Sequence, residues 1–153
     1  MTGSRVLLDT NIVIELFKGN SSIISRLKNR KSVDVPVAVL GELLLGAYCS
    51  SNPEKHLKIV NAFLEKCHVL VTDNETAKQY ALIKAGLLRK GKPTPENDIW
   101  IAATAKRHNL KLVTSDKHFD EIDSIEIEKW TQIKKGSQIF SMGRRKYCKV
   151  HYP

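Results

Sequence analysis

The amino-acid sequence predicts a single α/β domain: a three-layer α/β/α arrangement whose central parallel sheet has four or five strands, with helices on both faces. Short apolar runs of strand length alternate along the chain with amphipathic segments of helix length, and this alternation is typical of parallel sheets. Runs such as Val6-Leu7-Leu8 are apolar throughout, which indicates strands that are buried on both faces. A chain of 153 residues suits one domain of this kind.

Five segments have the length and composition of strands. They combine β-branched and other apolar residues, and turn-forming or charged residues bound them at both ends. The first of these runs ends at Asp9, and a later one ends just before Asp116. The expected strands cover residues 5–8, 33–39, 68–72, 111–115 and 124–129.

The segments between these strands have helical patterns. Ser21 or Ser22 is expected to cap the second helix, and Thr94 is expected to cap the last one with Pro95 in its first turn. Glu42 is expected near the start of the third helix, which follows the second strand directly. The other expected helices cover residues 11–18, 53–66 and 74–89, and the last one ends at Asn109.

The net charge of +9 is unevenly distributed along the chain. Residues 131–153 contain six basic residues and no acid, whereas residues 1–130 hold 19 basic and 16 acidic residues, or +3. We therefore expect a domain over residues 1–130 and a basic C-terminal extension over 131–153 that is either disordered or wrapped on the core. This charge favours a polyanionic partner such as RNA.

Several classes of protein are unlikely on composition. No apolar run approaches the roughly 20 residues that a membrane span needs, and the N-terminus lacks the apolar region of a signal peptide. We therefore expect a cytoplasmic protein without a membrane partner. The three cysteines and five histidines do not have the spacing of a disulfide framework or a zinc site.

Glu42 lies in an unusual sequence environment. The surrounding segment reads VAVLGELLLGA, and no Lys or Arg stands three or four residues away to form an ion pair on a helix surface. A carboxylate in such surroundings needs a partner, because desolvating a charge costs several kcal/mol.

Three further acids occupy informative positions. Asp9 and Asp116 follow strands, so both are expected at the carboxyl edge of the sheet, where open parallel sheets bind ligands. Asp98 lies in the first turns of the last helix. Together with Glu42 these carboxylates would repel one another, and a divalent cation with oxygen ligands, Mg²⁺ or Mn²⁺, would remove that repulsion. Taken singly, Asp9 and Asp116 could also be helix caps, and Asp98 could favour the helix dipole.

The segments around these acids resemble the PIN-domain family, and in particular its VapC branch, the toxins of toxin–antitoxin pairs. The resemblance covers roughly residues 4–130 and rests on the stretches LLDTNIVIELFKG, VAVLGELLLGA and PTPENDIWIAATAKRHNLKLVTSDKHFDEI. The order and spacing of all four acids match the family pattern. The family's metal-binding acids then correspond to Asp9, Glu42, Asp98 and Asp116, and its supporting polar positions to Asn11 and Thr114.

The resemblance implies a metal-dependent endoribonuclease that hydrolyses RNA phosphodiester bonds with one or two Mg²⁺ or Mn²⁺ ions. It also implies neutralisation by a cognate VapB-like antitoxin, and a homodimer. Apolar faces of the first two helices could form the dimer surface or could equally belong to the core. These faces contain Ile12, Leu16, Phe17, Ile23, Ile24 and Leu27.

Other functions remain open on the sequence alone. A housekeeping PIN nuclease in RNA processing, or a catalytically silent PIN scaffold that binds RNA or protein, would carry similar motifs. A haloacid-dehalogenase-like phosphatase is disfavoured because Asn11 occupies the position of its second acid. A receiver-like signalling module is disfavoured because no acid pair adjoins the first strand.

Overall fold

The computed structural model describes residues 4–130, and the predicted basic extension over 131–153 lies outside the described residues. Five parallel strands form one sheet in the order β3-β2-β1-β4-β5, which confirms the predicted sheet. The central strand β1 pairs with β2 on one side and β4 on the other. The strands are β1 (Val6–Leu8), β2 (Val33–Pro36), β3 (His68–Leu70), β4 (Lys111–Thr114) and β5 (Ile127–Lys129).

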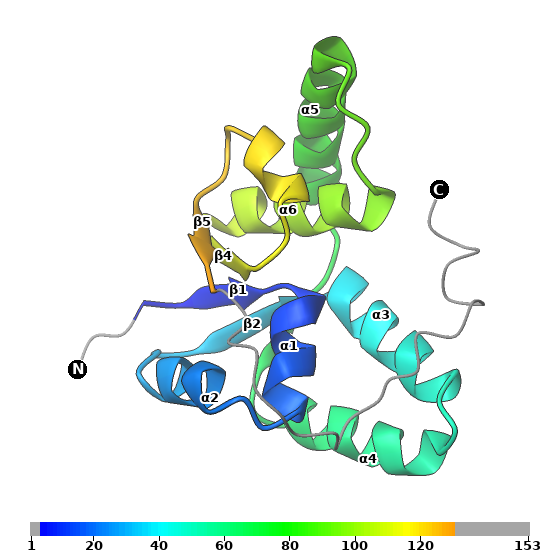
Figure 1. Cartoon of the computed structure of the whole chain (residues 1–153). Helices are drawn as coiled ribbons and strands as arrows, with labels where there is room; N and C mark the ends of the chain where they lie inside the picture. Colours follow the sequence, from blue (N-terminus) through cyan, green and yellow to red (C-terminus); the bar gives the residue numbers. More distant parts are fainter. Residues whose placement is uncertain (1–3, 131–153) are drawn as a thin grey trace.

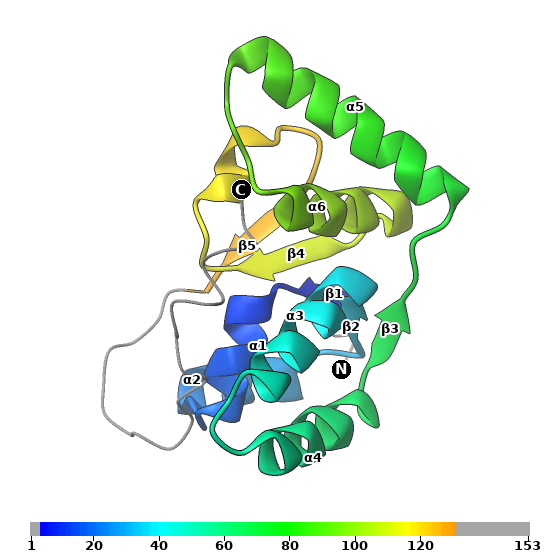
Figure 2. The ribbon, with the colours of Figure 1, turned by 90° about the vertical axis from the view of Figure 1, so that its right-hand side faces the viewer.

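Helices cover both faces of this sheet, giving the three expected layers (Figures 1 and 2). The first four helices pack below the sheet in Figure 1, whereas α5 and α6 pack above it. The helices are α1 (Thr10–Phe17), α2 (Ser21–Lys28), α3 (Val37–Tyr48), α4 (Pro53–Leu64), α5 (Asn74–Lys90) and α6 (Glu96–His108). A short 3-10 helix, η1 (His118–Glu121), lies between β4 and β5.

The ends of the helices follow from short-range hydrogen bonding. Asp73 caps α5, since its carboxylate accepts a bond from the Thr76 N–H at 2.8 Å. The predicted serine cap of α2 is wrong: Asn20 supplies the cap, and its amide oxygen accepts from Ser22 and Ile23 N–H groups. Asn109 ends α6 in the left-handed conformation, with φ of 50°.

Two predicted boundaries are wrong, and a proline stands at each of them. The expected strand over residues 33–39 stops at Pro36, and α3 begins at once with Val37, so Glu42 lies in mid-helix rather than near the start. Thr94 does not cap α6, because its hydroxyl donates to the Lys92 carbonyl instead, at 3.4 Å. Pro95 is the residue that precedes the first turn of α6.

The core forms where the sheet meets both helical layers. Ile12 and Ile23 belong to it, and Leu16, Phe17 and Leu27 pack against it. Five of the six named residues therefore serve the core, and the sixth, Ile24, is half-buried. The homodimer stays a prediction. The largest fully buried side chains include Trp130, Phe119, Leu7, Leu8, Ile12, Ile23, Leu43, Ile101 and Leu112.

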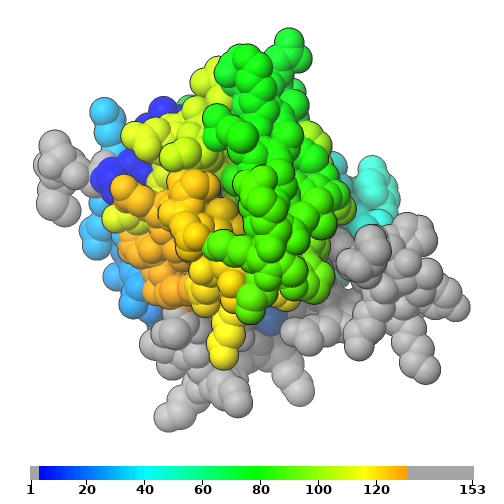
Figure 3. All heavy atoms as spheres, turned by 90° about the horizontal axis from the view of Figure 1, so that it is seen from above, coloured from blue at the N-terminus to red at the C-terminus, as the bar shows by residue number. Residues whose placement is uncertain are grey.

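The segment after β4 packs beside α5 on the upper face of the molecule (Figure 3). Lys90, the last residue of α5, binds the Asp123 carboxylate at 2.6 Å and the Glu121 carbonyl at 3.1 Å. Phe119, the second residue of η1, is fully buried. These contacts fix the path of the chain immediately after Asp116.

An ion pair between a buried carboxylate and a half-exposed arginine stabilises the opposite, amino-terminal edge of the sheet. The Asp34 carboxylate is fully buried, and the Arg5 guanidinium donates to both of its oxygens, at 2.9 and 3.2 Å. Such a two-pronged pair holds the charge that burial would otherwise make costly. His68 Nδ1 lies 3.5 Å from the same carboxylate. Asp34 therefore belongs to the scaffold and lies apart from the four predicted site acids.

No helix among residues 4–130 is long and apolar enough to cross a membrane.

The burial pattern of α3 gives a test of the fold with an internal control. Leu43 is fully buried, whereas Leu45, two residues along the same helix, is 42% exposed. We expect Leu43→Ala to lower the free energy of unfolding by about 2–5 kcal/mol, because it leaves a cavity in the core. Leu45→Ala should change it by no more than about 0.5 kcal/mol. Urea denaturation of both variants measures these values, and equal losses would contradict the orientation of α3.

Candidate active site

The predicted site residues lie at the carboxyl edge of the two central strands, β1 and β4. Asp9 follows β1 directly, and Thr114 is the last residue of the neighbouring strand β4. The chain leaves β1 for the lower layer, while β4 is preceded by a helix of the upper layer (Figure 2). The chain thus changes sides between these strands, and open parallel sheets bind ligands at such a point.

Asp9 is buried and is held by two neutral donors. Its carboxylate is the N-cap of α1 and accepts the Thr10 N–H at 2.8 Å. The Thr114 hydroxyl donates to its other oxygen at 2.7 Å. The same hydroxyl accepts the N–H of Asp116 at 2.9 Å. One threonine therefore fixes both the Asp9 carboxylate and the backbone of Asp116. Asp9 caps α1 and also lies in the candidate site, so the two interpretations of Asp9 are compatible.

Glu42 enters the site from α3 and has the neutral partners that its apolar sequence environment required. Its carboxylate accepts the Thr10 hydroxyl at 2.6 Å and the Asn97 side-chain amide at 3.0 Å. Thr10 begins α1, and Asn97 lies in the first turn of α6. Glu42 consequently joins three helices at the edge of the sheet, and no Lys or Arg among residues 4–130 forms an ion pair with it.

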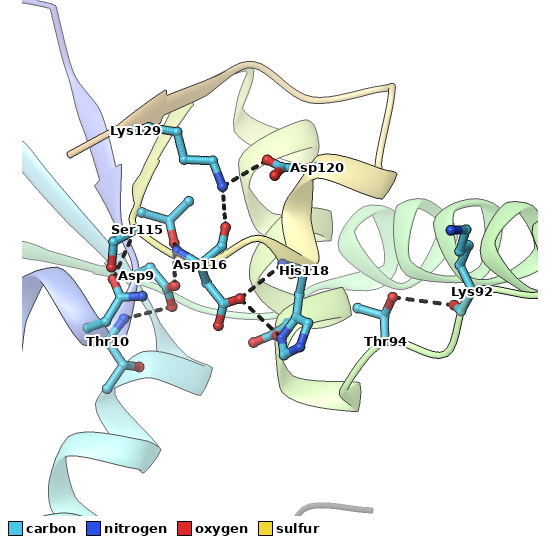
Figure 4. Close-up of polar contacts among 12 residues, drawn as sticks. Asp9, Thr10, Lys92, Thr94, Ser115, Asp116, His118, Asp120 and Lys129 are labelled. Atoms are coloured by element: carbon cyan, nitrogen blue, oxygen red, sulfur yellow. Dashed lines mark hydrogen bonds and ion pairs between the residues drawn. The ribbon is translucent and has the colours of Figure 1, made fainter. Parts of the chain in front are cut away.

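Asp98 and Asp116 both lie close to the same nitrogen of the His118 imidazole. His118 Nδ1 is 2.9 Å from Asp98 Oδ2 and 3.3 Å from Asp116 Oδ1. The backbone N–H of His118 also donates to Asp116 Oδ1, at 2.9 Å, and Figure 4 shows the two side chains turned toward one another. Donor atoms of these three residues all lie within 4.8 Å of one another, the spacing of a group that could hold a metal ion.

The loop after β4 is fixed on both sides of Asp116. The Asn11 amide oxygen accepts the Ser115 N–H at 3.4 Å. Lys129, at the end of β5, donates to the Asp116 carbonyl oxygen and pairs with the Asp120 carboxylate at 2.8 Å (Figure 4). Lys129 thereby holds the backbone of Asp116 and leaves its carboxylate to the site.

Burial dominates the electrostatics of the cluster. Desolvation raises the pKa of Asp9 to about 7 against the opposing hydrogen bonds from Thr114 and Thr10, and repulsion from Asp98 and Glu42 raises it further. Desolvation also raises the pKa of Asp98 to about 6, with repulsion from Asp116 and Glu42 in the same direction. Within residues 4–130, no Lys or Arg side chain forms an ion pair with any of the four site carboxylates.

The structure brings the predicted residues to one edge, but the four acids do not converge on one point. Asp98 and Asp116 are grouped with His118, whereas Asp9 and Glu42 are linked through Thr10. Thr114 and Asn11 have the supporting contacts described above.

Sequence reasoning missed three polar residues of the site. Thr10, Asn97 and His118 all contact a predicted acid. Each stands one or two residues from one of the four acids in the sequence. Their proximity to the acids in the sequence is the signal that could have identified them. Only the tertiary structure shows that Thr10 and Asn97 donate hydrogen bonds to Glu42, which is distant in sequence from both.

Comparisons with known proteins identify the family of the chain. A family model described as "PIN domain" matches residues 6–125 of the chain. The ribonuclease VapC2 of Haemophilus influenzae is 34% identical over 129 residues, which cover 82% of this chain and 98% of that protein. The tRNA(fMet)-specific endonuclease VapC of Shigella flexneri is 31% identical over 130 residues, covering 83% of this chain and 98% of its own length.

The fold has the same relatives among solved structures. In the crystal structure of DNA-bound VapBC from Salmonella typhimurium, one chain matches with a TM-score of 0.78 at 32% identity, covering 86% of this chain and 100% of that chain. This match and the two sequence relatives span nearly the whole of the described domain. The chain belongs to the PIN-domain family, and within that family it is similar to the VapC ribonucleases.

Proposed function

We propose that the protein is a metal-dependent endoribonuclease that acts as the toxin of a VapBC-type toxin–antitoxin pair. One observation carries the proposal: four carboxylates lie at the carboxyl edge of the sheet, and within residues 4–130 none of them pairs with a Lys or Arg. Neutral donors hold Asp9 and Glu42, and Asp98 and Asp116 lie against His118. The relatives named ribonuclease and endonuclease support the choice of RNA as the substrate. The overall charge of +9 also suits a polyanionic substrate.

The side chains of the site fit a divalent cation. Carboxylate oxygens are the ligands that Mg²⁺ and Mn²⁺ prefer, and the raised pKa values of Asp9 and Asp98 indicate an excess of negative charge in a desolvated place. We assign Asp9, Glu42, Asp98 and Asp116 as the residues that would hold one or two ions. Thr114 would orient Asp9, and Asn11 would fix the loop that carries Asp116.

The chemistry follows from the charges. A bound divalent ion would polarise the scissile phosphoryl group and offset its negative charge. Without such an ion, the four carboxylates would repel an RNA phosphate. The neutral side chains would orient the carboxylates toward the ion. Thr10 and Asn97 hold Glu42, and Thr114 links Asp9 to the backbone of Asp116.

A partner protein is part of the proposal. Two solved relatives, 32% and 28% identical to this chain, are described as DNA-bound VapBC and as VapBC-1. We infer that a VapB-like antitoxin binds this chain and blocks the acidic edge. We also propose that the protein acts in the cytoplasm, because RNA and a cognate antitoxin would both be present there.

The metal requirement of the proposed activity can be tested directly. Purified protein should cleave single-stranded RNA with Mg²⁺ or Mn²⁺ and should lose this activity in EDTA. Asp98→Asn should lower the cleavage rate by at least about a hundredfold, the usual scale for losing one main electrostatic group. Asp123→Asn is the matched control, because Asp123 is an exposed acid that pairs with Lys90 outside the cluster. Equal cleavage with and without chelator would end the metal-nuclease proposal.

The second prediction separates charge from structure at Glu42. Glu42→Gln can keep both hydrogen bonds, because an amide oxygen accepts from Asn97 and an amide N–H can donate to the Thr10 hydroxyl. We expect activity to fall by about a hundredfold or more, since an amide is a weak metal ligand. In EDTA the variant should melt at or above the wild-type temperature, because repulsion is relieved.

Thermal melts with and without Mg²⁺ measure the structural part. Added Mg²⁺ should raise the melting temperature of the wild type more than that of Glu42→Gln. Glu65→Gln, at an exposed position, should respond to Mg²⁺ like the wild type. A destabilised Glu42→Gln protein that still cuts RNA would show that Glu42 serves the fold alone.

The third prediction concerns pH. The pKa of Asp9 is raised in the folded state to about 7, so between about pH 4 and pH 7 the folded protein binds more protons than the unfolded chain. In EDTA this group therefore lowers stability as pH rises through that window, by at most about 1.4 kcal/mol per pH unit. Asp9→Asn should flatten this slope.

Metal should reverse the sign of the effect. Protons compete with the ion for Asp9 and Asp98, so stabilisation by Mg²⁺ should be small near pH 5 and large near pH 8. Calorimetric melts over this range, with EDTA or with Mg²⁺, give both slopes. Parallel pH profiles in the two conditions would exclude Asp9 and Asp98 as metal ligands.

A further inference from the structure

His118 is the residue of the site whose role the four-acid pattern leaves unexplained. Its Nδ1 atom lies 2.9 Å from Asp98 Oδ2 and 3.3 Å from Asp116 Oδ1. Of the residues that the structure describes, this trio is the one group of His, Cys, Asp and Glu side chains with the spacing of a metal site. The imidazole thus occupies the place where a third ligand would stand.

The fold sets the position of this imidazole from both sides. Phe119, the next residue, is fully buried and anchors η1 in the core. On the other side, the backbone N–H of His118 binds the Asp116 carboxylate, and Lys129 holds the Asp116 carbonyl. The His118 side chain itself is 51% exposed, so core packing does not account for its orientation.

A nitrogen ligand changes which ions the site prefers. Mg²⁺ prefers carboxylates and water as ligands. First-row transition-metal ions bind nitrogen ligands such as imidazole, with an affinity that rises along the series from Mn²⁺. We propose that His118 is a metal ligand beside Asp98 and Asp116, and that it makes this centre prefer Mn²⁺ to Mg²⁺. The inference rests on the proposed metal-dependent function and narrows the identity of the ion.

Binding of the ion needs only a simple proton balance. The lone pair of Nδ1 would bind the metal, and the other ring nitrogen, Nε2, would carry the proton of the neutral imidazole. A neutral imidazole with its proton on Nδ1 would exchange it through solvent for one on Nε2, with no net release, whereas an imidazolium would release one proton to solvent. The two carboxylates would keep their charges and face the ion.

The test uses the full-length protein and Mn²⁺ as the probe, with binding rather than cleavage as the readout. The chain is freed of metal with EDTA, the chelator is removed, and Mn²⁺ is titrated while electron paramagnetic resonance measures the free ion. Pulsed measurements on the bound ion then report any directly bonded nitrogen. We expect an imidazole nitrogen signal in the wild type and its loss in His118→Asn. His68→Asn, which changes an exposed histidine at the far edge of the sheet, should keep the signal.

The second measurement is selectivity, from competition between Mg²⁺ and Mn²⁺. In His118→Asn the preference for Mn²⁺ should fall by about tenfold or more, the scale on which removed ligand partners alter metal affinity. Affinity for Mg²⁺ should change little, because asparagine and water both offer an oxygen. Circular dichroism melts check that each variant is folded, and His118→Gln replaces His118→Asn if the latter is not.

The outcomes separate this inference from the proposed function. Bound Mn²⁺ without a nitrogen signal, or an unchanged ion preference in both variants, would overturn the role of His118 and leave the four-acid site standing. In that case His118 is a hydrogen-bond donor that only positions the two carboxylates. Failure of the wild type to bind Mn²⁺ or Mg²⁺ at all would overturn the metal-dependent function itself, and this inference with it.

Discussion

The arrangement of the site depends on one constraint: four carboxylates stand at the edge of two central strands, and within residues 4–130 no Lys or Arg forms an ion pair with any of them. Neutral donors bind two of them instead. The hydroxyls of Thr10 and Thr114 and the amide of Asn97 each bind one of the acids. Such donors orient a carboxylate without cancelling its charge, and the raised pKa values of Asp9 and Asp98 reflect the repulsion and desolvation that remain. The hydrogen bonds therefore orient Asp9 and Glu42, and an excess of negative charge remains at the site.

Much of this architecture could be predicted from the sequence, because the signals are local. Apolar runs such as Val6-Leu7-Leu8 mark buried strands, and Asp9 follows directly. In parallel sheets the carboxyl ends of the strands share one edge, so the sequence predicts Asp9 and Asp116 at the same edge whatever the order of the strands. The pairing of β1 with β4 and the contacts of Thr114 agree with that expectation.

What could not be predicted depends on contacts between distant segments. Pro36 ends β2 and α3 begins directly after it, although the valines that follow favour a strand by propensity. Packing of Val39 and Leu43 into the core overrides that preference. Asn97 donates to an acid 55 positions away, and the Arg5–Asp34 pair spans 29 positions. No short-range pattern carries such information, and the same holds for the contact between His118 and Asp98, which are 20 positions apart.

The hydrogen bond between Asp9 and Thr114 joins residues that are 105 positions apart, and this distance has a consequence for protein synthesis. The ribosome makes the chain from its amino terminus, so Asp9 and Glu42 emerge long before Asp98, Thr114 and Asp116. The central strand β1 also lacks its neighbour β4 until that late stage. A nascent chain consequently holds no assembled acid cluster while most of it is being translated. The cluster forms only when almost the whole domain has left the ribosome, and a product of premature termination before β4 would never contain it.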